Sequence, residues 1–570
     1  MSQSWRVNLV FILFFLMGGA LIARLFDLQF LNYEYYQVLA KNQHQILEKL
    51  LPQRGKILLQ DLSNPNNYTP LALDKEFQQV YLVPRNISED KKEELVKKLS
   101  EILGIDKEMI FKKANKKNDP YEPLKHKISD QKAKDIKNIN IKGVGVLSET
   151  WRYYPYDALG SHVVGFVSRR KDNQRIGQYG LEKSLQKELS GEPGIIEGRK
   201  DTSGFYIPSL ESKIKPAKDG DDLLLTIDQN IQFKAEKELK KVIEKYKAES
   251  GSIIVMNPKT GAIRAMANSP EFNPNEYNKV EEIGVFINPS VQKVYEPGSI
   301  FKPITMAIGL DTNSIKPETV YEDKGRIQVG GRVIKNVDGK VYGDQDMTQV
   351  LEKSLNTGAV FIQQSTKDNY FKSYIQKFGF GSLTGLELPG EVRGDIFNLF
   401  TGRKINLANI SFGQGISVTP IGMINAVSAI ANNGKMMQPY IIEKRIKSDG
   451  EEIITEPKMR KQVISKETAN KVTKMMVSVV DSGFGKKAQV RGYSVAGKTG
   501  TAQVPDPKGK GYSEDTIHSF IGFAPAFNPR FIILVKLDKP QDVRFSSESV
   551  ASVFHNLAEY ILNYFEIPPA

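Results

Sequence analysis

The sequence predicts an α+β fold in which an antiparallel sheet is flanked by helices. Three observations favour it. A helix and two short strands open the second half of the chain, three consecutive strands lie near the C-terminus, and a closing amphipathic helix follows them. Strands joined by short turns pair antiparallel, and helices with one apolar face cover such a sheet. At 570 residues the chain is too long for one core, so several domains are expected.

The composition is that of a globular protein, with 40% hydrophobic and 25% charged residues. Cysteine is absent, which excludes disulfides, thiol nucleophiles and cysteine-based metal sites. The five histidines are separated by at least 36 residues (126 to 162), so histidine pairs on one helix that would bind zinc are excluded as well. We therefore expect neither a cofactor nor a metal.

A run of seventeen uncharged and predominantly apolar residues, Val7 to Ala23, lies between Arg6 and Arg24. This length is at the lower limit for crossing a bilayer, and two further apolar residues extend it. A signal peptide cleaved after Gly18-Gly19-Ala20 would leave three apolar residues on the mature chain. We therefore expect residues 1–26 to be a short cytoplasmic N-terminus and an uncleaved transmembrane anchor.

Residues 27–216 are predicted to form an N-terminal domain. A helix is expected from Leu25 to Leu51, and an extended segment begins at residues 52–57. Between Lys91 and Lys142 there are fifteen lysines but also nine acidic residues, and the net charge of the chain is +13. Mixed charges of this kind indicate a solvated helical surface rather than a phosphate-binding stripe, so residues 85–142 are expected to be a helical subdomain and no nucleic acid is expected as a partner.

Residues 217–570 are predicted to form the main domain, because the segment before it is polar and rich in turn residues. The expected elements, in order, are a strand at 223–227, a helix at 229–247, strands at 252–256 and 262–266, helices opening at Thr419-Pro420 and spanning 465–480, strands at 493–504, 519–523 and 530–537, and a helix at 547–565.

One segment of this domain, Glu296 to Pro303 (EPGSIFKP), combines a nucleophile with a base. Ser299 and Lys302 lie three residues apart at the predicted start of an apolar helix, so the amine lies beside the hydroxyl. A serine hydroxyl is a weak nucleophile until a base takes its proton, and a neutral lysine can be that base. Burial of the helix would disfavour the ammonium form of Lys302.

The pair alone is a weak signal, because the same spacing occurs six more times, for example at Ser290 and Lys293. The ordered set is specific: Ser354-Leu355-Asn356 lies 55 residues on, and Lys498-Thr499-Gly500-Thr501 lies 144 residues beyond that. This combination is typical of active-site serine penicillin-recognising enzymes. A second Lys-Thr-Gly, at Lys259, precedes the serine in a predicted hairpin turn, and we interpret it as structural.

The three motifs are assigned complementary roles. Ser354 and Asn356 are expected on a turn between two helices, where a hydroxyl and an amide reach a cleft. Lys498 lies in a predicted strand, where Gly500 permits close backbone approach and an edge would pair with an extended peptide. Its positive charge and the hydroxyls of Thr499 and Thr501 would hold a substrate carboxylate. A second cation close to Lys302 would also keep that base unprotonated.

The chain resembles the class B penicillin-binding proteins, and among them the division-specific septal transpeptidases of the FtsI type, over nearly its full length. The segments that carry the resemblance are Arg24-Leu25-Phe26-Asp27-Leu28-Gln29, Arg54-Gly55, Arg152-Tyr153-Tyr154-Pro155, His162-Val163-Val164-Gly165, Leu225-Thr226-Ile227-Asp228, EPGSIFKP, Phe412-Gly413-Gln414-Gly415 and Lys498-Thr499-Gly500-Thr501-Ala502-Gln503. The resemblance implies a penicillin-binding/β-lactamase-like transpeptidase domain, preceded by an elongated pedestal domain of the dimerisation type and one transmembrane helix.

The resemblance also implies the reaction. A donor stem peptide ending in D-Ala-D-Ala would acylate Ser299 and release D-alanine, and an acceptor amine would then form the cross-link. The backbone N–H groups of Ser299 and Thr501 would form the oxyanion hole, and β-lactams would acylate Ser299. The implied partners are stem peptides, nascent glycan strands, an FtsW-type glycosyltransferase and other division proteins. The implied location is the bacterial plasma membrane, with the catalytic domain on the outer side.

Two departures from the family pattern stand out: Leu355 is bulkier than the usual small residue, and the passage RGKILLQD after residue 53 lacks an acidic-arginine pair. Three alternatives stay open. An elongation-specific class B transpeptidase would use the same chemistry with other partners. A D,D-carboxypeptidase or β-lactamase would use water in place of the amine, although the long anchored N-terminal domain argues against it. A non-catalytic β-lactam sensor or division scaffold would keep the pocket without turnover.

Overall fold

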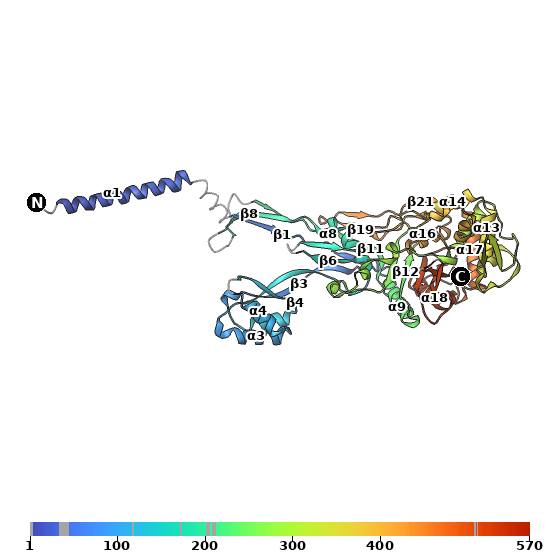
Figure 1. Ribbon diagram of the computed structural model, residues 1–570, viewed down its shortest axis with the longest axis horizontal. Helices are drawn as coiled ribbons and strands as arrows, with labels where there is room; N and C mark the ends of the chain where they lie inside the picture. Colours follow the sequence, from blue (N-terminus) through green and yellow to red (C-terminus); the bar gives the residue numbers. More distant parts are fainter. Residues whose placement is uncertain are drawn as a thin grey trace. The chain divides into compact units, whose positions relative to one another are not determined.

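The structure, a computed structural model, describes residues 4–32, 45–116, 119–170, 174–200, 206–207, 213–506, 509 and 511–569. The chain divides into two compact units, residues 1–53 with 190–220 and residues 54–189 with 221–570. Figure 1 follows the elements along the chain. In the first unit these are helix α1 (Ser4–Phe26), a π-helical turn (Asp27–Leu31) and a sheet of four strands, β1 (Gln45–Leu50), β8 (Gly194–Lys200), β9 (Tyr206–Ile207) and β10 (Lys213–Lys215).

The expected apolar helix is present, and the helix predicted beyond it is partly wrong. Within the described ranges, Val7–Leu31 is the one helix long and apolar enough to cross a membrane. Residues 45–50 are a strand, not the end of a helix, because β1 pairs antiparallel with β8 from Gln45↔Arg199 to Leu50↔Gly194. This partner comes about 150 residues later in the chain. Local helix propensity is only a weak predictor, and such long-range pairing overrides it. The remainder of that prediction, residues 33–44, lies outside the described residues.

The second unit contains a seven-stranded sheet built from both halves of the sequence. Its order is β20-β19-β11-β2-β3-β4, and β5 pairs with β3. The strands are β2 (Ile57–Gln60), β3 (Thr69–Leu82), β4 (Glu122–Ile128), β5 (Val144–Tyr153), β11 (Asp222–Asp228), β19 (Ile442–Ile446) and β20 (Glu452–Ile454). Because β2 and β11 pair in parallel, the segment that precedes residue 217 contributes directly to the sheet of the main domain.

The lysine-rich subdomain is helical, as predicted, with β4 as an additional strand. Its helices are α3 (Glu89–Leu103), α4 (Lys107–Ala114) and α5 (Asp130–Lys137). Leu95, Leu99 and Leu103 on one face of α3 are buried against the other elements, and the lysines lie mainly on the opposite, solvated face. A 3-10 turn (Pro84–Asn86) precedes α3, and the shorter elements that follow the subdomain are α6 (Ser161–Val164), β6 (Phe166–Arg169), β7 (Arg175–Gln178), α7 (Gly180–Ser184) and α8 (Gln186–Ser190).

A five-stranded antiparallel sheet forms the centre of the second unit, as predicted. Its order is β13-β12-β24-β23-β22, so β22 is an edge strand. The strands are β12 (Ser250–Met256), β13 (Ile263–Ser269), β22 (Ala496–Pro505), β23 (Tyr512–Ala524) and β24 (Phe531–Asp538). Lys259 lies in the turn that joins β12 to β13, which confirms that the second Lys-Thr-Gly is structural.

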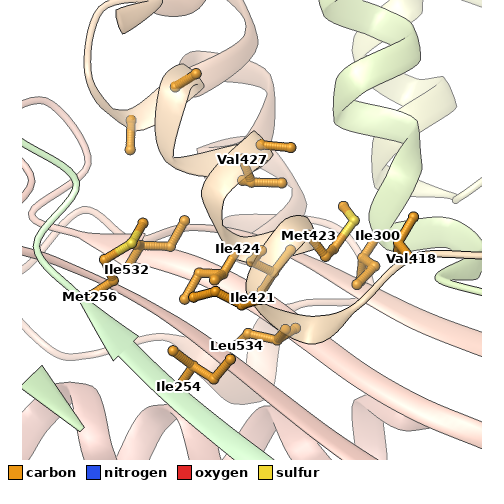
Figure 2. Close-up of a cluster of buried hydrophobic side chains, with 14 of the residues drawn as sticks. Ile254, Met256, Ile300, Val418, Ile421, Met423, Ile424, Val427, Ile532 and Leu534 are labelled. Atoms are coloured by element: carbon orange, nitrogen blue, oxygen red, sulfur yellow. The ribbon is translucent and has the colours of Figure 1, made fainter. Parts of the chain in front are cut away.

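Helices cover both faces of this sheet because successive strand residues point to opposite sides. Ile253 and Val255 pack with α9 (Gln229–Tyr246) and α18 (Ser546–Tyr564). Ile254 and Met256 face α16 (Pro420–Ala431), and Figure 2 shows Ile421 and Ile424 of that helix above Ile254 and Leu534. Each such aliphatic side chain contributes about 1.5–3 kcal/mol by its burial.

The remaining elements of the second unit complete the chain. The helices are α10 (Pro289–Gln292), α11 (Lys302–Asp311), α12 (Met347–Glu352), α13 (Asn356–Ser365), α14 (Asp368–Lys377), α15 (Lys404–Ser411) and α17 (Lys466–Asp481). The short strands are β14 (Tyr321–Asp323), β15 (Arg326–Val329), β16 (Arg332–Lys335), β17 (Gly343–Gln345), β18 (Lys435–Met437) and β21 (Met459–Gln462). The 3-10 turns are Pro274–Lys279, Ile283–Phe286, Gly298–Phe301, Val337–Gly339, Phe397–Phe400 and Lys486–Ala488.

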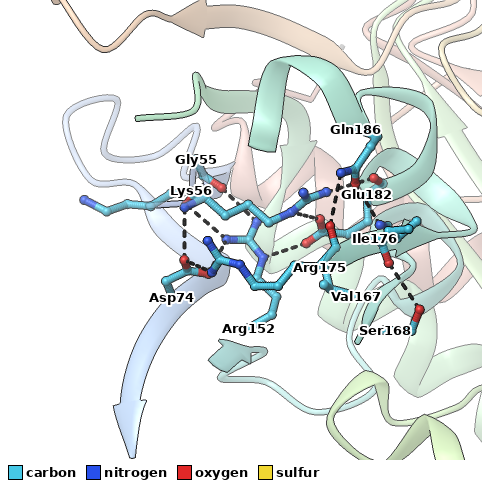
Figure 3. Close-up of polar contacts among 12 residues, drawn as sticks. Gly55, Lys56, Asp74, Arg152, Val167, Ser168, Arg175, Ile176, Glu182 and Gln186 are labelled. Atoms are coloured by element: carbon cyan, nitrogen blue, oxygen red, sulfur yellow. Dashed lines mark hydrogen bonds and ion pairs between the residues drawn. The ribbon is translucent and has the colours of Figure 1, made fainter. Parts of the chain in front are cut away.

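The arginine of the RGKILLQD passage, Arg54, belongs to a buried ion cluster of the second unit that also contains Arg152 of β5 and Glu182 of α7. Arg54 Nε lies 2.6 Å from Glu182 Oε2, and Arg152 Nε lies 2.6 Å from the other carboxylate oxygen of Glu182. Figure 3 shows Arg152 also reaching the carbonyl oxygen of Gly55, at 2.8 Å. Burial raises the pKa of Glu182, but Arg152 and Arg54 more than offset this and lower it overall. Glu182 therefore pairs with two guanidinium groups that lie away from water, and Asp74, 3.6 Å from Arg152, supplies a second negative charge.

Replacing Glu182 with alanine should destabilise the second unit by about 3–5 kcal/mol, because the buried guanidinium of Arg54 would lose its ion-pair partner and that of Arg152 would keep only Asp74, at 3.6 Å. Chemical denaturation followed by circular dichroism measures this loss. Glu467→Ala is the matched control, since it breaks an exposed pair with Lys471 and should change the stability little. Equal free energies of unfolding of the two variants would show that the cluster does not stabilise the fold.

Candidate active site

Ser299 lies in the 3-10 turn Gly298–Phe301, and α11 begins at Lys302. Gly298 has a φ of +58° and donates its N–H to the carbonyl of Gly413 at 3.0 Å. A Cβ on Gly413 would lie 2.1 Å from the carbonyl oxygen of Gly298, so this approach of two backbones requires glycine. The contact fixes the start of the turn that carries the predicted nucleophile.

The same turn lies against the edge strand β22. A Cβ on Gly500 would lie 2.9 Å from Ile300 Cγ2 and 3.2 Å from its backbone nitrogen, and a Cβ on Gly298 would lie 2.9 Å from Ala502 Cβ. The backbone between Gly500 and Ala502 therefore runs beside the backbone that carries Ser299. Close approach of this kind is the reason a strand interior tolerates a glycine.

Lys302 is buried, with 1% of its surface exposed, and its amine contacts the serine–asparagine motif. Lys302 Nζ donates to the carbonyl oxygen of Ser354 at 2.6 Å and to Asn356 Oδ1 at 2.8 Å, and lies 3.3 Å from Ser354 Oγ. Burial and the nearby charge of Lys498 hold the pKa of Lys302 well below its usual range. A neutral amine that donates its two hydrogens to these oxygens keeps its lone pair free to accept a proton.

Lys498 reaches the same hydroxyl from β22. Its amine lies 2.9 Å from Ser354 Oγ and 3.0 Å from the carbonyl oxygen of Thr499, and its side chain is fully buried. Burial lowers the pKa of Lys498 to about 7. The hydroxyl of Ser354 therefore joins two amines and can pass a proton between them.

Ser354 lies on the turn between α12 and α13, as predicted, whereas Asn356 is the first residue of α13 and not part of that turn. Ser354 has a φ of +54°, an uncommon conformation for a residue with a side chain, and this turns its hydroxyl and carbonyl toward the lysines. Asn356 Nδ2 donates to the carbonyl of Lys335 at 3.0 Å, which leaves its oxygen facing Lys302. Leu355 between them is 1% exposed and belongs to the main core, so the bulkier middle residue points away from the site.

The hydrogen bonds of the site join Lys302, Ser354, Asn356, Lys498 and Thr499. Ser299 and Thr501 are placed beside this group by backbone packing, and Ser299 is half-buried. The hydroxyl of Thr501 bonds to Ser546 at the start of α18, accepting from its backbone N–H at 3.1 Å. In the described part of the chain, no group of three or more histidine, aspartate or glutamate side chains is arranged to hold a metal ion.

Glu296 is a residue of the site to which the sequence analysis gave no role. Its carboxylate accepts the backbone N–H of Gly415 at 2.9 Å and the hydroxyl of Tyr512 at 3.0 Å, and burial raises the pKa of Glu296. It thereby ties the segment before Ser299 to the loop that contains Gly413 and to the hairpin of β22 and β23. Its position beside the serine motif was visible in the sequence, but its two distant partners were not.

Comparisons with known proteins match both halves of the chain. The family profile described as penicillin binding protein transpeptidase domain matches residues 251–559, and the profile described as penicillin-binding protein dimerisation domain matches residues 49–225. The chain is 36% identical to stage V sporulation protein D of Bacillus subtilis over 97% of this chain and 85% of that protein. It is 30% identical to the peptidoglycan D,D-transpeptidase FtsI homolog of Mesostigma viride over 99% of this chain and 96% of that one.

Two solved structures show the same fold over most of the chain. Penicillin binding protein 2X of Streptococcus thermophilus superimposes with a TM-score of 0.76 at 26% identity, covering 91% of this chain and 80% of that one. Penicillin binding protein 3 of Mycobacterium tuberculosis, complexed with aztreonam, superimposes with a TM-score of 0.70 at 26% identity, covering 92% of this chain and 98% of that one.

Replacing Lys498 with glutamine should raise the pKa of Lys302, because the variant lacks the positive charge that disfavours a second ammonium nearby. Less of Lys302 would then be neutral at a given pH, although burial would still keep its pKa below the ordinary value. A pH titration of isotope-labelled lysine side chains by NMR measures the change. Lys536→Gln is the control, because Lys536 is also buried on this sheet but pairs with Asp538. An unchanged or lower pKa of Lys302 in Lys498→Gln would contradict this reading.

Proposed function

The chain belongs to the class B penicillin-binding proteins, a family of peptidoglycan D,D-transpeptidases, and from this premise we propose that it cross-links stem peptides through an acyl-enzyme on Ser299. The observation that carries the proposal is the buried amine of Lys302, one turn after Ser299 and bonded to Ser354 and Asn356. A buried lysine with a lowered pKa is a suitable general base for an adjacent serine.

These contacts support the following first half of the reaction. The neutral amine of Lys302 takes the proton of Ser299 Oγ as that oxygen attacks the carbonyl carbon of the penultimate D-alanine. The N–H groups of Ser299 and Thr501 stabilise the negative oxygen that forms. When the peptide C–N bond breaks, the departing amine of D-alanine needs a proton. The Ser354 hydroxyl, bonded to Lys302 and Lys498, supplies it and is reprotonated by a lysine.

The second half reverses these proton movements. The amine of an acceptor stem peptide attacks the acyl-enzyme carbonyl and gives up a proton to the Ser354–lysine group, and Ser299 leaves as the hydroxyl. The edge strand β22 supports this substrate class, because its free edge can pair with an extended peptide. Lys498, Thr499, Gly500 and Thr501 on that strand would bind the terminal carboxylate of the donor.

The location and domain roles are part of the same proposal. Helix α1 would anchor the protein in the plasma membrane as a single pass, with the catalytic domain on the outer side, where the peptidoglycan is built. Residues 27–216 would be the pedestal and residues 217–570 the transpeptidase domain. Nascent glycan strands, an FtsW-type glycosyltransferase and other division proteins would be its partners.

Incubation with a fluorescent penicillin should label the purified protein covalently, and Ser299→Ala should abolish the label, because the acyl bond forms on that hydroxyl. Gel fluorescence measures the adduct. Ser290→Ala is the matched control, since Ser290 and Lys293 have the same spacing without the other motifs. An adduct that persists in Ser299→Ala would disprove the assignment of the nucleophile. Rapid turnover of the penicillin by the wild-type protein would favour a hydrolase, and no adduct at all would leave a non-catalytic scaffold.

The biological role proposed is septal cell-wall synthesis, and a sporulation role is the second candidate. Overall likeness to the FtsI-type proteins, including 30% identity over 99% of this chain, supports the first. The 36% identity to a stage V sporulation protein supports the second. Both roles use the same transpeptidation chemistry, so they differ only in when and where the protein acts.

Depleting the protein in its host should produce filaments, because cells that cannot build a septal wall continue to elongate. Phase-contrast microscopy of a strain with a repressible copy measures this, and a strain that carries only Ser299→Ala should match the depleted one. Rounded cells would instead identify an elongation role. Normal growth with defective spores would identify the sporulation role.

A further inference from the structure

Helix α13, which begins with Asn356, lacks a capping side chain of its own. The residue at its N-cap is Leu355, which has no side-chain acceptor for the free N–H groups of the first turn. Such groups lie at every helix start and need a partner when they are buried. Here the partner comes from another element: Asn336 Oδ1 accepts the N–H of Asn356 at 3.0 Å and the N–H of Thr357 at 3.2 Å.

Asn336 is itself held in one orientation. Its Nδ2 donates to both oxygens of Asp323, at 2.9 and 3.0 Å, and the carboxylate of Asp323 is 1% exposed. Asp323 also accepts from the hydroxyl of Thr357 at 2.7 Å and from the backbone N–H of Tyr342 at 3.0 Å. A carboxylate only accepts hydrogen bonds, so the nitrogen of Asn336 must face Asp323 and its oxygen must face the helix.

This arrangement determines where the side chain of Asn356 points. Asn336 fixes the backbone N–H of Asn356, and the carbonyl oxygen of the neighbouring residue Lys335 accepts a hydrogen bond from Asn356 Nδ2 at 3.0 Å. With both groups held from one short segment, Asn356 Oδ1 faces Lys302 Nζ at 2.8 Å. The segment that contains β14 to β17 thus supports Lys302, the proposed general base, through Asn356.

We propose that Asn336, oriented by Asp323, is a positioning residue for Ser299 acylation, because it caps α13 from outside and thereby fixes Asn356 against Lys302. The inference deepens the proposed transpeptidase function and rests on it. Displacements of about 1 Å in a catalytic group reduce rates by roughly a hundredfold, so loss of this cap should act on the acylation step. In this proposal the substrate binds along β22 before acylation. Among the described residues, no hydrogen bond joins Asn336 to that strand.

The test measures the covalent acylation rate of the full chain by fluorescent penicillin at several concentrations, which separates the first-order step from the preceding binding. Asn336→Ala should slow the first-order step by roughly tenfold to a hundredfold and change the half-saturating concentration little. Asn288→Ala is the matched control: Asn288 is equally buried and caps another helix, α10, by accepting the N–H of Ser290 at 3.0 Å. It should leave the first-order step unchanged, with thermal melts confirming that both variants are folded.

A reciprocal exchange distinguishes positioning from simple filling of space. Asn336→Asp alone should also slow acylation, because two carboxylates would then face each other at about 3 Å. Adding Asp323→Asn should restore the rate, since the new amide donates to the new carboxylate, which still accepts the N–H groups of α13. Unchanged acylation in Asn336→Ala, an equal loss in Asn288→Ala, or no rescue by the exchange would each overturn the proposal. A wild-type protein that takes up no penicillin would refute the proposed function instead.

Discussion

Two lysine amines that share one serine hydroxyl are the contact on which the candidate site depends. Lys302 Nζ and Lys498 Nζ lie 3.3 and 2.9 Å from Ser354 Oγ, and both side chains are excluded from water. Two ammonium groups so placed would repel each other and would lack hydration, so together they hold fewer protons than two exposed lysines. This is the condition that a lysine must meet to serve as a base near neutral pH.

Holding two such amines together requires a rigid surrounding structure. Lys498 comes from the edge strand of the central sheet and Lys302 from the first turn of α11, and the two approach because Gly298, Gly413 and Gly500 let backbones meet without side chains between them. The apolar contacts between α16 and the sheet fix the helices on that face (Figure 2). The burial that stabilises the fold is therefore the same burial that lowers the pKa of both lysines.

Features set by local patterns could be predicted from the sequence, and those set by distant partners could not. The apolar helices, the antiparallel strands, the edge position of Lys498 and the turn at Ser354 follow from periodicity and motif order. Residues 45–50 were misassigned because their strand exists only through pairing with β8. Glu296 and Asn336 were missed for a related reason: a lone polar residue gains a role only from groups that lie 13 to 216 residues away, such as Tyr512 for Glu296 and Asp323 for Asn336.

Strand β11 pairs with β2 on one side and with β19 on the other, so the segments that the two family profiles match do not form separate sheets. Two strands far apart in the sequence complete one another in a single sheet, and the dimerisation-domain profile itself ends at residue 225, inside β11. A catalytic fragment that begins after residue 225 would lack most of β11, and β19 would then present unpaired backbone donors and acceptors to other chains. The two halves therefore depend on each other for a fully hydrogen-bonded sheet.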